Sequence, residues 1–199
     1  MRLRPLMLLS ALLVIAPALA HAQDFGVMES AETINKGNFK LRGNPMFIFG
    51  KDADATTGVA ITGGYGFTPR VDAEGQLAFY DGLTFFGGNA EYWLIKDQEL
   101  DFSLAGGLHG STGDNRTDAF GVDLTFLGSK HLTSKFELYG GLDIAFENPD
   151  DAEAFTTVHL VPGVEFKINP DLDFVSEFGI GLNDSSRHYF AIGLAYYIR

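Results

Sequence analysis

Large apolar side chains recur at every second position along much of this sequence, and that period constrains the fold more than any other feature. The run Phe136–Phe146 shows it most clearly, because Leu142 belongs to one set of positions while Glu137 and Asp143 belong to the other. A helix of 3.6 residues per turn does not produce this alternation, whereas a pleated strand with one apolar and one polar face does. The run is therefore predicted to be a β-strand whose two faces meet different environments.

Ten runs of this kind follow one another along the chain. They cover about residues 38–49, 57–67, 72–80, 83–95, 100–108, 120–126, 136–146, 157–166, 172–182 and 190–198. Each is close to the ~10 residues that a tilted membrane-spanning strand requires. Turn sequences separate them, among which Asp81-Gly82 is a strong two-residue hairpin signal. The pattern predicts an all-β fold, an antiparallel up-and-down transmembrane β-barrel of about ten strands, with eight or twelve strands as alternatives.

The start of the chain has the organisation of a secretory signal peptide. Arg2 and Arg4 precede an apolar stretch, and Ala20-His21-Ala22 supplies the small residues of a cleavage site. The apolar stretch is shorter than the ~20 residues of a membrane-spanning helix, which favours a cleaved peptide over a retained anchor. We expect three parts: a signal peptide at 1–22, a periplasmic N-terminal segment at 23–37 and the outer-membrane barrel at 38–199.

Composition narrows the range of partners. The chain carries 26 acidic against 14 basic residues, a net charge of −12, and this excludes nucleic acid as a partner because phosphate binding needs a basic patch. It contains no cysteine, which suits an oxidising compartment. Its 18 phenylalanines and 24 glycines fit strands whose two faces differ sharply.

Alternation alone does not say whether the apolar face meets lipid or a buried core. A soluble lipocalin-like barrel would bury that face. Here almost every run carries a large apolar stripe, and the opposite face carries charges and glycines, as a crowded and hydrated interior would. We predict that Phe136, Leu142 and Phe146 face lipid while Glu137 and Asp143 face the interior. A soluble periplasmic lipocalin-like ligand-binding barrel remains the alternative.

The signal peptide, the alternating strands and the closing run His188–Arg199 together resemble the bacterial outer-membrane β-barrel proteins of the small porin-like kind. The closing run ends on Ile198-Arg199 rather than on an aromatic residue. The resemblance implies a place in the cell outer membrane of a Gram-negative bacterium, with lipid and the outer-membrane assembly machinery as partners. It also implies a structural or porin-like role, with limited passage of small solutes or ions. A surface-binding barrel that acts through its outer loops is the alternative.

Charged residues on the polar face are the candidate lumen-lining residues. They are Lys40, Arg42, Glu74, Glu91, Asp123, Glu137, Asp143, Glu165 and Glu177. In one interpretation they form an ion-paired, hydrogen-bonded interior, because unpaired buried charges are costly. In the other, Asp123, Asp143 and Glu177 line a cation-preferring pore near mid-depth, with small solutes or cations as partners.

No arrangement of residues indicates catalysis. His109, His159 and His188 are expected near the outer ends of their strands as exposed rim histidines, and no nucleophile motif accompanies them. No diagnostic spacing of metal ligands appears either. We therefore expect no enzyme activity, no catalytic residues, no cofactor and no metal.

Overall fold

A computed structural model describes residues 26–50, 54–80, 82–96, 99–113 and 118–199. The predicted signal peptide and Asp81 lie outside the described residues. Within them, no helix is long and apolar enough to cross a membrane.

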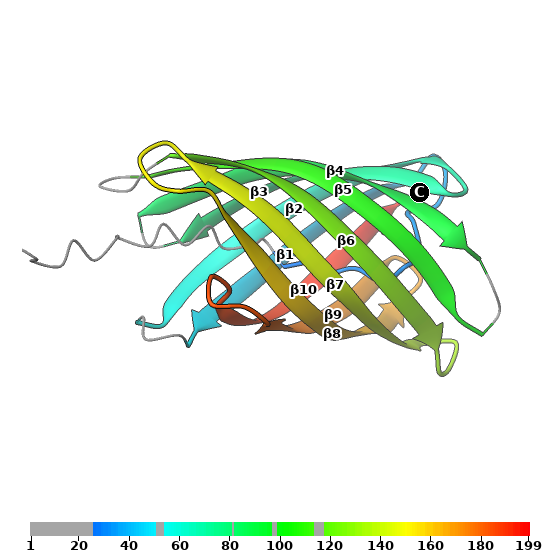
Figure 1. The fold of residues 1–199 in the computed structure, drawn as a ribbon. Helices are drawn as coiled ribbons and strands as arrows, with labels where there is room; N and C mark the ends of the chain where they lie inside the picture. The colour runs from blue at the N-terminus through cyan, green and yellow to red at the C-terminus, as the bar shows by residue number, and fades with distance from the viewer. Residues whose placement is uncertain (1–25, 51–53, 81, 97–98, 114–117) are drawn as a thin grey trace, which may run out of the picture.

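The described residues form ten strands that close into an antiparallel barrel (Figure 1). The strands are β1 (Phe39–Phe49), β2 (Thr56–Thr68), β3 (Val71–Tyr80), β4 (Leu83–Ile95), β5 (Asp101–Gly113), β6 (Ala119–His131), β7 (Phe136–Pro149), β8 (Phe155–Asn169), β9 (Leu172–Gly181) and β10 (His188–Ile198). Each strand pairs with its neighbours in the chain, and β1 pairs with β10 to close the wall. The predicted fold class is confirmed, and each predicted run overlaps one strand.

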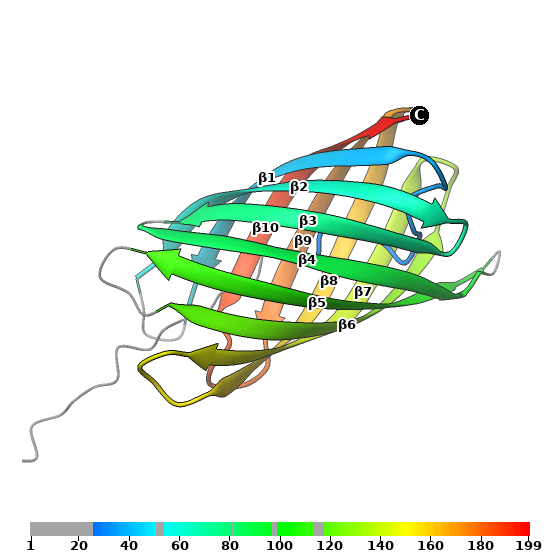
Figure 2. The same ribbon diagram turned by 90° about the horizontal axis from the view of Figure 1, so that it is seen from above.

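The two ends of the barrel are named by the residues that lie at them. We call the end with Phe39 and Ile198 the terminal end, and the opposite end, with the turn at Gly82, the loop end. The strands run between them at a strong tilt (Figure 2). At the loop end Tyr80 pairs with Leu83, and Gly82 has a φ of +71°, which suits the predicted tight turn.

Two prolines interrupt the ladders of the wall. Pairing between β1 and β10 skips from Gly43 to Met46 around Pro45, and pairing between β8 and β9 skips around Pro162. A proline has no N–H to donate to the ladder. Pairing resumes in the same register on either side, so each interruption stays local.

The two faces of the wall separate as predicted. Leu142 and Phe146 are 37% and 55% exposed, whereas Glu137 and Asp143 are 3% and 6% exposed. Every strand carries at least one exposed large apolar side chain on the outer surface.

The interior is not uniformly polar. Toward the loop end it contains a packed apolar cluster that includes Met46, Ile48, Tyr80, Leu83 and Phe85. Toward the terminal end it is lined by charged side chains. A lumen this narrow is filled by side chains rather than by a wide water column, so apolar packing is stabilising there too.

Candidate functional site: a lumen closed by the N-terminal segment

Residues 26–38, which we call the plug segment, enter the barrel before β1 begins. Val27, Met28, Ala31 and Ile34 are all buried, although none of them belongs to a strand. We expected residues 23–37 in the periplasm, but the described part, from Gly26 onward, lies largely inside the lumen. No periodicity in the sequence indicates this, because an extended segment bonded to a barrel interior has no fixed repeat.

The carboxylate of Glu177 on β9 holds the plug segment near its start. Its Oε1 accepts hydrogen bonds from the Val27 amide at 2.8 Å and the Tyr189 hydroxyl at 2.5 Å. Its Oε2 accepts from the Met28 amide at 2.6 Å and the Tyr139 hydroxyl at 2.9 Å. An ionised carboxylate can only accept, and four donors around two oxygens fit it well.

Met28 is fixed from both sides of its backbone. Besides the bond from its N–H, its carbonyl accepts a hydrogen bond from Arg42 Nη1 at 2.8 Å. Its φ of 54° lies in the left-handed region, which is uncommon for a residue other than glycine. The surrounding bonds therefore impose this conformation on the segment.

Further contacts continue toward the terminal end. The Ala31 amide donates to Ser129 Oγ at 3.3 Å, and the Ile34 amide donates to Asp72 Oδ2 at 2.5 Å. At its C-terminal end the plug segment forms backbone hydrogen bonds with Gly66 on β2. It is thus bonded to the wall along its whole described length.

The two basic candidates, Lys40 and Arg42, meet the same acid. Lys40 Nζ contacts Glu74 directly and lies 3.7 Å from Glu29 on the plug segment, while Arg42 Nη2 is 3.6 Å from Glu74. All of these side chains are buried. This is the arrangement that the ion-paired interpretation expects, and Glu29 ties the plug segment into it.

Two tyrosines reach Glu177 from the wall because glycines make room for their rings. Tyr189 pairs across the ladder with Gly179, and Tyr139 pairs with Gly163. A Cβ on either glycine would overlap the tyrosine ring. The rings can therefore lie against the wall and reach Glu177.

We expected His109 to be an exposed rim residue, and the structure shows that this expectation is wrong. It is 6% exposed, its Nδ1 lies 2.8 Å from Asp123 Oδ2, and its Nε2 lies 2.7 Å from Glu147 Oε1. His159 is also buried, at 1% exposed. The alternation of β5 places His109 on the inner face, and the structure agrees with that periodicity rather than with a rim position near the strand end.

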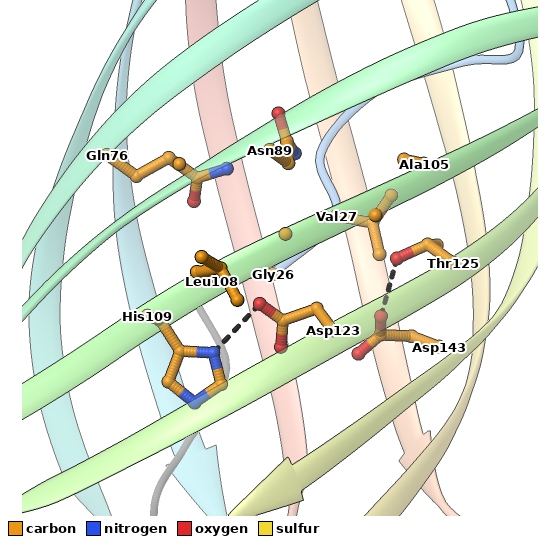
Figure 3. A pocket seen from close by; sticks show the side chains of 13 residues that line it. Gly26, Val27, Gln76, Asn89, Ala105, Leu108, His109, Asp123, Thr125 and Asp143 are labelled. Atoms are coloured by element: carbon orange, nitrogen blue, oxygen red, sulfur yellow. Dashed lines mark hydrogen bonds and ion pairs between the residues drawn. The ribbon is translucent and has the colours of Figure 1, made fainter.

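A small cavity of about 50 Å³ lies beside this histidine and the start of the plug segment. Figure 3 shows Asp123 turned toward His109, and Asp143 bonded to the Thr125 hydroxyl at 2.7 Å. Asp123 and Asp143 line this cavity, whereas Glu177, the third predicted pore residue, instead holds the plug segment. One water needs about 10–15 Å³ of such space, so the cavity has room for a few water molecules.

All nine predicted lumen residues are buried or partly buried. Seven are buried, namely Lys40, Arg42, Glu74, Glu91, Glu137, Asp143 and Glu177, and two, Asp123 and Glu165, are partly buried. The structure brings Lys40, Arg42 and Glu74 together.

A closed antiparallel barrel with an apolar outer surface and a polar, filled lumen defines a class of protein, the membrane-spanning β-barrels. In lipid only a closed barrel leaves no strand edge without hydrogen bonds. The chain belongs to the family of the outer membrane protein beta-barrel domain, whose model matches residues 6–197. Its place is accordingly the outer membrane, and the expected resemblance to small porin-like barrels is confirmed.

Solved structures of other outer-membrane proteins share this fold. The crystal structure of an outer membrane channel from Pseudomonas putida F1 is similar with a TM-score of 0.58 and 8% identity, over 84% of this chain and 98% of that chain. The KdgM porin in complex with disordered oligogalacturonate is similar with a TM-score of 0.50 and 9% identity, over 81% of this chain and 99% of that chain. A search of curated protein sequences finds no match.

Proposed function

We propose that this protein is a porin-like barrel that its own plug segment holds closed, so that passage of small solutes or cations requires displacement of the segment. The observation that carries the proposal is the Glu177 clamp, which binds two backbone amides of the segment in mid-lumen. Export by the cleaved signal peptide at residues 1–22 and insertion by the outer-membrane assembly machinery belong to the same proposal.

The wall behind the plug segment suits cations. Of the nine predicted lumen residues seven are acidic, and the two basic ones are both held by Glu74. A ring of carboxylates favours cations in a narrow pore. Once the segment leaves, its bonds to Glu177 and Asp72 are vacated and these carboxylates add to the negative lining.

We infer a non-enzymatic role from the geometry at His109. A general base needs a ring nitrogen that can take a proton from substrate. Both ring nitrogens of His109 already face carboxylate oxygens, those of Asp123 and Glu147. The arrangement supports a structural link between β5, β6 and β7.

Conductance in planar lipid bilayers tests the proposal. We expect refolded full-length mature protein to give few openings, and a variant lacking residues 26–35 to give steady openings with cation selectivity in a KCl gradient. The deletion ends before the backbone bonds to Gly66, so the wall ladders stay intact. Heat-modifiable gel mobility shows whether the deletion variant folds. If the variant folds but conducts no more than the full-length protein, the proposed closure by the plug segment is wrong and the barrel has a purely structural role.

A further inference from the structure

Three side chains with metal-binding atoms converge at the terminal end of the barrel. His131 is the last residue of β6, and Glu137, near the start of β7, is its cross-strand partner. Glu32 comes from the plug segment and reaches both. The group therefore joins two neighbouring strands of the wall to the segment inside it.

The spacing of these atoms suits a small divalent cation. His131 Nε2 lies 2.9 Å from Glu32 Oε1 and 3.7 Å from Glu137 Oε2, and the three ligand atoms lie within 4.8 Å of one another. Ligand atoms 2.0–2.1 Å from a tetrahedral zinc ion stand about 3.3 Å apart. The two observed distances lie on either side of that value.

The exposure of the three side chains allows an ion to enter and be held. The side chains of Glu32 and His131 are 38% and 40% exposed, so an ion can arrive from water and keep a water ligand. The side chain of Glu137 is only 4% exposed, and among the described residues its Oε1 has no hydrogen-bond partner. A buried carboxylate oxygen without a partner is costly, and a cation at this point would satisfy it.

The charge of the group agrees with a divalent ion. Two carboxylates and a neutral imidazole carry a charge of −2, which a dication would balance. Protonation of His131 would add one positive charge and would balance only half of that negative charge. Lys167 lines the same small space as His131 and Glu137 and opposes a cation there. An imidazole with two carboxylates is a nitrogen and oxygen ligand set that suits zinc.

We propose that Glu32, His131 and Glu137 bind a zinc ion, which fastens the plug segment to the wall between β6 and β7. The binding site stands on its own geometry, while its effect on passage rests on the proposed function. A ligand that binds only the docked state, at ten times its dissociation constant, raises the docked population relative to the undocked one by about tenfold.

Calorimetric titration of the untagged, refolded protein with zinc chloride tests the site. We expect one zinc per chain, and at least tenfold weaker binding in His131→Ala and in Glu32→Gln. Both residues are well exposed, so neither substitution should disturb folding. Glu153→Gln, an exposed acid of the loop end, is the matched control and should bind zinc as the wild type does. Equal affinity of the wild type and His131→Ala would overturn the site.

Hydrogen exchange of the peptide covering residues 26–35 tests the fastening separately from conductance. Zinc at ten times its dissociation constant should slow this exchange about tenfold in the wild type. It should leave the exchange of His131→Ala unchanged. Zinc that binds one per chain but does not slow the wild-type exchange would overturn the fastening, whatever the bilayer recordings show.

Discussion

The substitution Glu177→Gln perturbs the plug segment where it is held most firmly. Each carboxylate oxygen accepts one backbone amide of the segment and one tyrosine hydroxyl. Glutamine keeps one oxygen and replaces the other with an NH₂ group that cannot accept. A tyrosine hydroxyl can rotate and accept from that group, but a backbone N–H cannot. Whichever way the amide turns, either Val27 or Met28 loses its acceptor.

The magnitude follows from that single loss. A hydrogen bond to a charged group contributes about 1.5–3 kcal/mol. Since about 1.4 kcal/mol corresponds to a factor of ten, docking of the segment should weaken by about ten- to a hundredfold. The shape of the side chain is unchanged, so the barrel wall should remain intact.

Hydrogen exchange of residues 26–35 measures this directly, because the amides exchange when the segment undocks. Exchange in Glu177→Gln should be about ten- to a hundredfold faster than in the wild type. Glu165→Gln, a lumen glutamate of β8 that faces Asp173, is the matched control and should change little. A less than threefold change in Glu177→Gln, or an equal change in both variants, would refute the clamp.

Two further substitutions test the packing of the lumen. Gly179→Ala places a methyl group against the Tyr189 ring, which should lower the free energy of unfolding in urea by about 1–3 kcal/mol. Gly75→Ala is the control, because an added Cβ there meets nothing within 4 Å, and it should leave the free energy of unfolding unchanged. An equal loss of stability in both variants would contradict the placement of the ring. His109→Ala leaves its two carboxylate partners facing each other without the histidine, which should cost about 3 kcal/mol. An unchanged urea midpoint for that variant would show that the histidine does not link the strands.

The sequence alone determined the wall of this protein. Each strand meets the same two environments, so the faces of runs such as Phe136–Phe146 could be assigned locally. The turn signal in the sequence after Tyr80 also predicted that this residue and Leu83 lie on one side of the sheet, and the two residues pair in the structure. A period of two depends only on neighbouring residues. The inner charges could be identified in the same way, although their partners could not.

Only the tertiary structure decided what fills the lumen. Residues 26–35 have no period, and their partners are remote: Glu177 is 150 residues from Val27, and His131 is 99 residues from Glu32. Closure of the barrel brings these groups together, and no local pattern records it. The alternation of β5 places His109 on the inner face, but its two carboxylate partners lie on the next two strands and are likewise fixed only by the tertiary structure. Local periodicity thus specifies the wall, while the contacts across the lumen depend on which strands face one another after closure.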